Sequence, residues 1–288
     1  MKIFRPILLS VISLAVALPA QLPAQKPSRP YTMLYVFGDS YSDTGAGYID
    51  GNGPTAVAYL AKRLGIPFTY FGDRDSKGKG LNFAVSGART GFDEGKFYPH
   101  GELLSRGMRN QVDDFAAIVH YGSIAFDPKQ TMFFLAGGLN DRGLPDGSTR
   151  IDLEADIDVL YAAGARRFTI ALLPTKIPAF ATAGTQFNPE LAKIPAEVLA
   201  KHPDAHIATS DWGPFYDEVI DHPAKYGLNN TTDPCAGRAL KNEDPTPCAT
   251  PDTYFYYNAA HPSTAAHRAV GDLLYAEALQ NARQPDAK

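Results

Sequence analysis

Short runs of apolar residues alternate with stretches of helical period along most of the chain. Four of these runs predict strands of a sheet, at residues 33–37, 81–85, 131–136 and 167–173. The third run is apolar at every position after its first, which is typical of a strand buried on both faces. A shorter strand is predicted at residues 206–209.

The stretches between these strands have the period of helices that bury one side. Apolar residues recur at i, i+3, i+4 and i+7 within residues 53–64, and similar stripes predict helices within 111–119 and 153–161. A weaker helix follows the fourth strand, another helix follows Trp212, and the last one runs through residues 270–278.

This alternation of strands and helices predicts an α/β fold with a parallel sheet. The chain has 288 residues and shows no internal repeat, so one doubly wound domain is expected over residues 31–281. Residues 282–288 form a polar tail. In such a sheet, ligands bind outside the carboxyl ends of the strands, and the chemistry is therefore expected in the loops that follow them.

The first 24 residues have the pattern of an export signal. Lys2 and Arg5 precede an apolar run at residues 7–17, and small residues follow up to Ala24. The run is shorter than the ~20 residues that span a bilayer, and Pro19 interrupts it, so a signal peptide at residues 1–24 is favoured over a membrane anchor. We therefore expect a secreted or periplasmic protein with no stable membrane anchor.

The charge balance argues against nucleic acid as a partner. The chain has 27 Lys and Arg against 31 Asp and Glu. Residues 1–24 hold two of the bases and no acid, so their removal leaves 25 bases, 31 acids and a formal charge of −6. A mildly acidic protein lacks the basic surface that nucleic acid requires.

The two cysteines, Cys235 and Cys248, lie in a stretch rich in Pro and Asp that is typical of a long loop. In an oxidising compartment we expect them to form a disulfide. On the chain-entropy model, closing a loop of that size stabilises the fold by roughly 3 kcal/mol. A catalytic cysteine or a two-cysteine metal site is disfavoured, because no histidine stands beside them at ligand spacing.

Four polar motifs stand where this fold would place its chemistry. Three follow the first three predicted strands and the fourth precedes the last helix: 38–45 (GDSYSDTG), 86–88 (SGA), 138–141 (GLND) and 258–263 (NAAHPS). Each alone is explained by turn chemistry, but the four together in this order are not. Pro262 is predicted at the first position of the last helix.

This set of motifs resembles the GDSL, or SGNH, hydrolase family. The family is named for a Ser, a Gly, an Asn and a His from four blocks, which are present as Ser40, Gly87, Asn140 and His261. The resemblance extends over residues 31–278 and implies a flavodoxin-like, three-layer α/β/α fold. It also implies hydrolysis of carboxylic esters of small molecules, lipids or acetylated sugars, with no cofactor and no metal. We expect a monomer.

The resemblance assigns a role to each of the four residues, and each role is chemically reasonable. Ser40 would attack the acyl carbon, and His261 would take the serine proton and return it to the leaving alcohol. The backbone N–H groups of Ser40 and Gly87 and the side-chain amide of Asn140 would form the oxyanion hole. Glycine at position 87 allows the backbone to approach the substrate closely.

Four further polar residues near the motifs are given structural roles. Asp39, Asp43 and Asp141 are interpreted as hydrogen-bond acceptors that fix the loops. His267, six residues past the predicted base, is interpreted as a packed histidine of the last helix.

Asn258 stands where the family usually has an aspartate, three residues before the histidine. An amide oxygen can accept the imidazole N–H, but it lacks the negative charge. Three interpretations follow: Asn258 orients His261, another acceptor such as a backbone carbonyl or Asp252 does so, or the enzyme is impaired.

Alternative functions use the same features differently. The site would equally serve a phospholipase, a lysophospholipase or an acyltransferase, and a catalytically weakened carbohydrate-binding module would use some of the 15 tyrosines. A dinucleotide-binding loop is disfavoured, because Gly45 and Gly47 are followed by Gly51, one residue too far along the chain.

Overall fold

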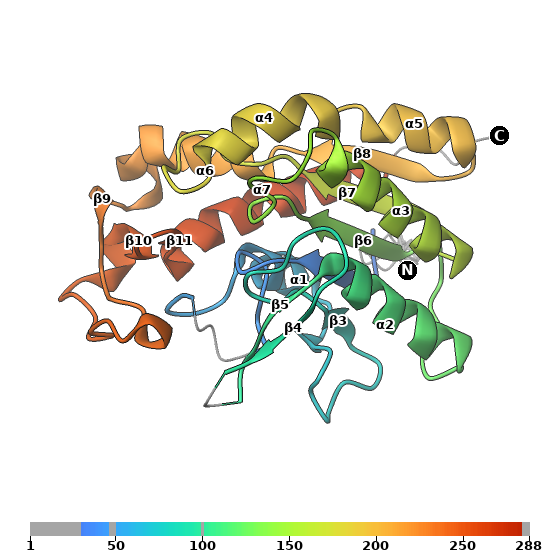
Figure 1. Ribbon diagram of the computed structural model, residues 1–288, viewed down its shortest axis with the longest axis horizontal. Coiled ribbons are helices and arrows are strands. Elements are labelled where there is room, and N and C mark those ends of the chain that lie inside the picture. The colour runs from blue at the N-terminus through green and yellow to red at the C-terminus, as the bar shows by residue number, and fades with distance from the viewer. Residues whose placement is uncertain (1–29, 46–49, 99–100, 284–288) are drawn as a thin grey trace, which may run out of the picture.

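The centre of the protein is a six-stranded parallel sheet (Figure 1). The computed structural model describes residues 30–45, 50–98 and 101–283. The strand order is β2-β3-β1-β6-β7-β8, with bounds β1 Met33–Gly38, β2 Phe68–Tyr70, β3 Gly80–Asn82, β6 Thr131–Ala136, β7 Arg167–Ala171 and β8 His206–Ser210. The predicted signal peptide at residues 1–24 lies outside the described residues, as does most of the polar tail.

Helices cover both faces of the sheet and give the predicted α/β fold its three layers (Figure 1). One face carries α1 (Ala56–Leu64), α6 (Trp212–Asp221) and α7 (Thr264–Asn281), of which α7 contacts both of the others. The other face carries α2 (Met108–His120), α3 (Ser148–Ala162), α4 (Ala181–Leu191) and α5 (Ile194–Lys201). None of the helices in the described part of the chain is long and apolar enough to cross a bilayer.

Aromatic side chains fix the two central strands against the helix layer. Every residue of β6 is buried, as its apolar sequence predicts. Phe115 of α2 packs against Tyr35 of β1 at a centroid distance of 4.8 Å and against Phe133 of β6 at 5.3 Å. Tilted and edge-on contacts of this kind add to the free energy of apolar burial. The ends of β1 and β6 are therefore held in fixed positions.

Several predicted boundaries are wrong. The strand predicted at 167–173 ends at Ala171. The strand predicted at 81–85 ends at Asn82, whose side chain accepts from the N–H of Ala84 at 3.0 Å, although the N–H groups of residues 83 and 85 still donate to β1 carbonyls. Pro262 is not the first residue of the last helix but belongs to β11 (His261–Pro262). The helix begins at Thr264, because the Ser263 side chain caps it.

The region predicted as a weaker helix and a long loop contains more structure than expected. The weaker helix is two helices, α4 and α5. The loop region holds β9 (Asn230–Pro234) and β10 (Tyr254–Asn258), which form a small sheet with β11, and three short 3₁₀ segments at 223–226, 239–241 and 251–253. A hairpin of β4 (Glu94–Phe97) and β5 (Leu103–Arg106) was also not predicted. The hairpin was not predicted because apolar and polar residues alternate only weakly in β4 and most of its side chains are exposed.

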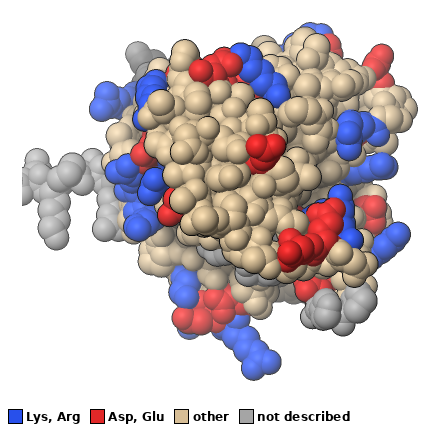
Figure 2. Space-filling model, turned by 90° about the vertical axis from the view of Figure 1, so that its left-hand side faces the viewer, with Lys and Arg blue, Asp and Glu red and all other residues tan. Residues whose placement is uncertain are grey.

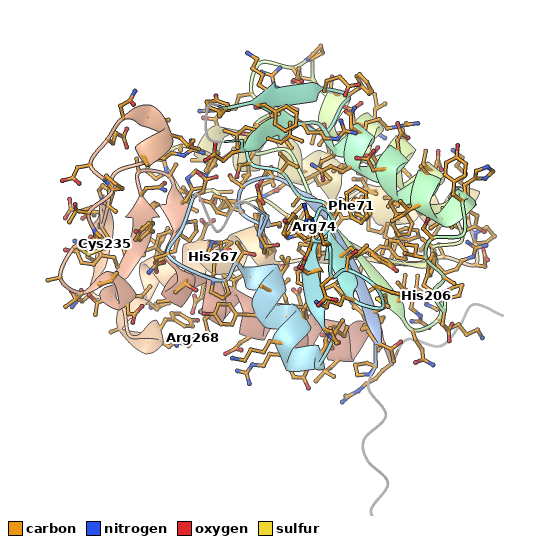
Figure 3. All side chains as sticks on the ribbon, turned by 90° about the horizontal axis from the view of Figure 1, so that it is seen from below. Phe71, Arg74, His206, Cys235, His267 and Arg268 are labelled. Carbon is orange, nitrogen blue, oxygen red and sulfur yellow. A yellow bond between two sulfur atoms is a disulfide. The ribbon has the colours of Figure 1, made fainter. Side chains whose placement is uncertain are left out.

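The predicted disulfide is present. Cys235 and Cys248 are joined, and the backbone N–H of Cys248 donates to the carbonyl of Cys235 at 2.7 Å. Figure 3 shows Cys235 in the outer part of the segment that carries β9. The bond closes the loop that lies between β9 and β10.

Candidate active site

The strand order brings three of the four motifs together. β3, β1 and β6 are neighbours in the sheet, so the loops that follow them meet at the same carboxyl edge. The close approach of β1 to β6 explains the glycine of the first motif, because a Cβ on Gly38 would lie 2.7 Å from the carbonyl oxygen of Ala136. Ser40, Gly87 and Asn140 all stand in these loops.

A chain of hydrogen bonds links the first motif to the fourth. His261 Nε2 lies 2.8 Å from Ser40 Oγ, and His261 Nδ1 lies 2.8 Å from Asn258 Oδ1. All three residues are buried. An amide oxygen only accepts, so Nδ1 carries the ring proton and Nε2 is free to accept one from the serine.

The small sheet and the first loop set the position of His261. Asn258 and His261 are paired across β10 and β11, which puts both side chains at the same place. Tyr41, next to the serine, donates its hydroxyl to the carbonyl of Ala260 at 2.7 Å. The loop after β1 and the segment before α7 are therefore tied together on both sides of the Ser40–His261 contact.

Burial lowers the pKa of His261 from 6.5 to about 4. The negative charge of Asp50 acts in the opposite direction, and the positive charges of Arg238 and Lys241 lower the pKa further. The imidazole is consequently neutral at neutral pH, which is the state in which Nε2 can accept a proton.

Three hydrogen-bond donors of the motifs stand in the loops at this edge of the sheet. The backbone N–H groups of Ser40 and Gly87 have no acceptor among the described residues. Asn140 donates one amide hydrogen to the carbonyl of Ala88 at 2.9 Å, which orients the amide and leaves its second hydrogen for another acceptor. Gly87 has a φ of 81°, and a Cβ there would lie 2.9 Å from Ser105 Oγ, so this position requires glycine.

Buried carboxylates connect the loops. Asp43 accepts from the backbone N–H of Ser86 at 2.7 Å and so ties the first motif to the second. Asp141 accepts from the hydroxyl of Thr90 at 2.6 Å. Asp39 accepts from the backbone N–H of Tyr41 in the same loop, and burial raises the pKa of Asp39 to about 8. These contacts are the ones expected of loop-fixing acceptors.

His267 faces the interior from α7 (Figure 3). Its Nδ1 lies 2.6 Å from the hydroxyl of Tyr216, and burial lowers its pKa to about 3. It is therefore a packed, neutral histidine.

Sequence reasoning missed one residue of the site. Asp50 is buried, and its Oδ1 lies 3.9 Å from His261 Nδ1. Its loop belongs to no regular element, so no periodicity or motif spacing pointed to it. Asp252, the acceptor considered from the sequence, is instead exposed in the 3₁₀ segment 251–253.

A cavity of about 610 Å³ adjoins the loops that carry the first two motifs. Its walls come from the loops after β1, β2 and β3, the β4–β5 hairpin and α2, and they include Asp43, Phe71 and Phe83. No residue of the Ser40–His261–Asn258 chain lines it.

The match to known proteins agrees with the motifs. Residues 34–274 match the model of the family described as GDSL-like Lipase/Acylhydrolase. The chain belongs to this family. The resemblance drawn from the four motifs is thereby confirmed, and the three-layer α/β fold agrees with it.

Three relatives from Arabidopsis thaliana are similar to this GDSL family member. A GDSL esterase/lipase is 28% identical, over 41% of this chain and 39% of that protein. The anther-specific proline-rich protein APG is 24% identical, over 84% of this chain and 47% of that protein. A second GDSL esterase/lipase is 22% identical, over 85% and 86% of the two chains. The chain thus spans less than half the length of the first two relatives.

Solved structures of the family are more distant in sequence. A member of the lipolytic protein G-D-S-L family from Veillonella parvula is 14% identical, with a TM-score of 0.47 over 86% of this chain and 96% of that one. A carbohydrate acetylesterase from Sinorhizobium meliloti is 12% identical, with a TM-score of 0.42 over 86% and 97%.

Proposed function

We propose that the protein hydrolyses carboxylic esters through an acyl-enzyme, with Ser40 as the nucleophile. The observation that carries the proposal is the buried hydrogen-bond chain from Asn258 through His261 to Ser40 at the end of β1. Membership of the GDSL-like lipase/acylhydrolase family supports a hydrolase.

In the first half-reaction, Ser40 Oγ forms a bond to the acyl carbon while its proton passes to His261 Nε2. The carbonyl electron pair moves to the oxygen, where the N–H groups of Ser40 and Gly87 and the amide of Asn140 stabilise the negative charge. The bond to the alcohol then breaks, and the imidazolium returns the proton to the leaving oxygen.

In the second half-reaction, water replaces the alcohol. His261 takes a proton from the water as its oxygen attacks the acyl-enzyme, and the same oxyanion donors act again. Breakage of the ester bond to Ser40 releases the acid, and the proton returns to the serine oxygen. Asn258 keeps the ring proton on Nδ1 throughout, so that Nε2 faces the reacting oxygens.

A Ser40→Ala variant tests the nucleophile. We expect it to lose hydrolysis of p-nitrophenyl acetate and butyrate and to lose labelling by a fluorophosphonate probe, because the attacking oxygen is gone. Ser42→Ala is the matched control: Ser42 is equally buried, two residues away and outside the hydrogen-bond chain, so this variant should retain labelling and activity. Wild-type rates in Ser40→Ala would refute the assignment, and a carbohydrate-binding module would not be labelled at all.

We propose as substrates esters that carry no charge next to the bond that is cleaved. Figure 2 shows the side of the molecule on which β9, β10 and β11 lie, and most of that surface is uncharged. A panel of esters graded by acyl length, with an acetylated xylan and a phospholipid, separates short-chain esterase, sugar deacetylase and phospholipase activities. Acyl transfer is detected by adding an acceptor alcohol and measuring the new ester.

We also propose that the protein is exported and works in an oxidising compartment. The Cys235–Cys248 disulfide supports this, because such bonds persist outside the reducing cytosol. N-terminal sequencing of the mature protein would show whether residues 1–24 are removed.

A further inference from the structure

The hydrogen bond from His261 to Asn258 leaves a charge problem in the proposed mechanism. The imidazole becomes positive in each transition state, and an amide cannot neutralise it. The ring is buried, so water does not supply the missing stabilisation. A carboxylate near the ring would do so.

We propose that Asp50 is the positioning residue that supplies, through space, the negative charge that Asn258 lacks. This inference rests on the proposed esterase function. The Asp50 carboxylate is 5% exposed and lies 3.9 Å from His261 Nδ1, the ring nitrogen that does not contact Ser40. The distance is too long for a hydrogen bond and short enough for a strong interaction between buried charges.

Two contacts hold the carboxylate in place. Ser86 donates its hydroxyl to Asp50 Oδ2 at 2.5 Å, and the Arg238 guanidinium forms an ion pair with Oδ1. Ser86 directly precedes the oxyanion glycine, and Arg238 comes from the disulfide-closed loop. Asp50 therefore joins the second motif, the histidine segment and the loop after β9.

The structure divides between two residues the work that one aspartate does in the usual family pattern. Asn258 makes the hydrogen bond that fixes the ring and its tautomer, and Asp50 provides the charge. Arg238 and Lys241 oppose part of this effect, since their positive charges also reach the ring. Asp50 is the negative group among the charges that act on His261 in the described part of the chain.

A rescue experiment separates this role from a purely structural one. We expect Asp50→Asn to lower kcat about 10- to 100-fold with KM changed less than about threefold, because only the charged state of the ring loses stabilisation. Adding Asn258→Asp to that variant should restore most of kcat, because the second change returns a carboxylate to the ring. If Asp50 served only to hold Ser86 and Arg238 in place, a carboxylate at position 258 would not restore kcat.

Asp217→Asn is the matched control. Asp217 is a buried carboxylate that accepts hydrogen bonds from residues 175 and 176 and has no contact with His261. Its loss should therefore lower Tm, but it should not produce a fall in kcat that Asn258→Asp restores. If Asp50→Asn does not fold because Arg238 is left without its ion-pair partner, the Asp50→Asn, Arg238→Gln double variant removes both charges and should show a fall in kcat with the same rescue by Asn258→Asp.

Two results would overturn the proposal: wild-type kcat in Asp50→Asn or in the double variant, or no rescue by Asn258→Asp. They differ from failure of the proposed function. If the wild-type protein neither cleaves an ester nor reacts with a fluorophosphonate, the esterase assignment itself is wrong.

Discussion

At the scale of single residues, the proposed mechanism depends on a base, His261, that burial keeps neutral. His261 meets an amide at one nitrogen and the serine hydroxyl at the other, so its protonation state decides whether Ser40 can be activated. The four motif residues were found in the sequence because each stands directly after a recognisable strand or before a recognisable helix. Asp50 was not found, because its place beside the ring depends on how its loop folds.

The pH profile should show the low pKa of His261. Protonation of the base stops the reaction, and burial lowers its pKa to about 4, so we expect kcat/KM for p-nitrophenyl acetate to stay high down to pH 5 and to fall near pH 4. The same group affects stability. The unfolded chain binds a proton at His261 near pH 6.5, whereas the folded protein binds it only near pH 4. The contribution of His261 to the free energy of unfolding therefore decreases as the pH falls from 6.5 towards 4.

Circular dichroism at each pH separates the two effects. An acid limb centred at pH 6.5 in protein that is still folded would show that the imidazole is accessible to water, against the burial found here.

At the scale of elements, the segment between α6 and α7 gives the site its histidine. The sequence predicted a long loop there, but it folds into the β9–β10–β11 sheet, which pairs Asn258 with His261. Strands of five residues or fewer carry too weak a period to be recognised beside so many Pro and Asp residues. The disulfide was predictable, because the chain has only two cysteines and its first residues have the pattern of an export signal.

Removing the disulfide should weaken this element. For the Cys235→Ser, Cys248→Ser double variant we expect the free energy of unfolding to fall by about 3 kcal/mol, since the bond closes a loop of 13 residues in the unfolded chain. Urea unfolding followed by circular dichroism measures the change. The wild-type protein treated with a reductant should show the same loss, and an unchanged midpoint in both would contradict the prediction.

At the scale of the whole molecule, the parallel sheet and its aromatic core hold the three strand-end loops together. Phe115 is fully buried and contacts rings from β1 and β6, the strands that lead to Ser40 and Asn140. Packing in this core therefore determines the distances at the carboxyl edge.

Removing the Phe115 ring should lower the free energy of unfolding considerably. We expect Phe115→Ala to lower the free energy of unfolding by about 3–5 kcal/mol, because it removes buried contacts and leaves a cavity. Phe97→Ala is the control: Phe97 is 77% exposed on the β4–β5 hairpin, so its loss should change stability by less than about 0.5 kcal/mol. Equal effects of the two changes in urea unfolding would show that Phe115 is not part of a tightly packed core.

From the sequence we could predict the fold class, most of the helices, five of the six strands of the central sheet, the disulfide and the positions of the four motif residues. This was possible because burial imposes a period on the chain and because strand ends define where a parallel sheet binds its ligand. The tertiary structure alone decided where elements end, that Asn258 reaches His261, and that Asp50 lies beside the ring. Those facts depend on hydrogen bonds and distances between segments far apart in the chain, on which local pattern carries no information.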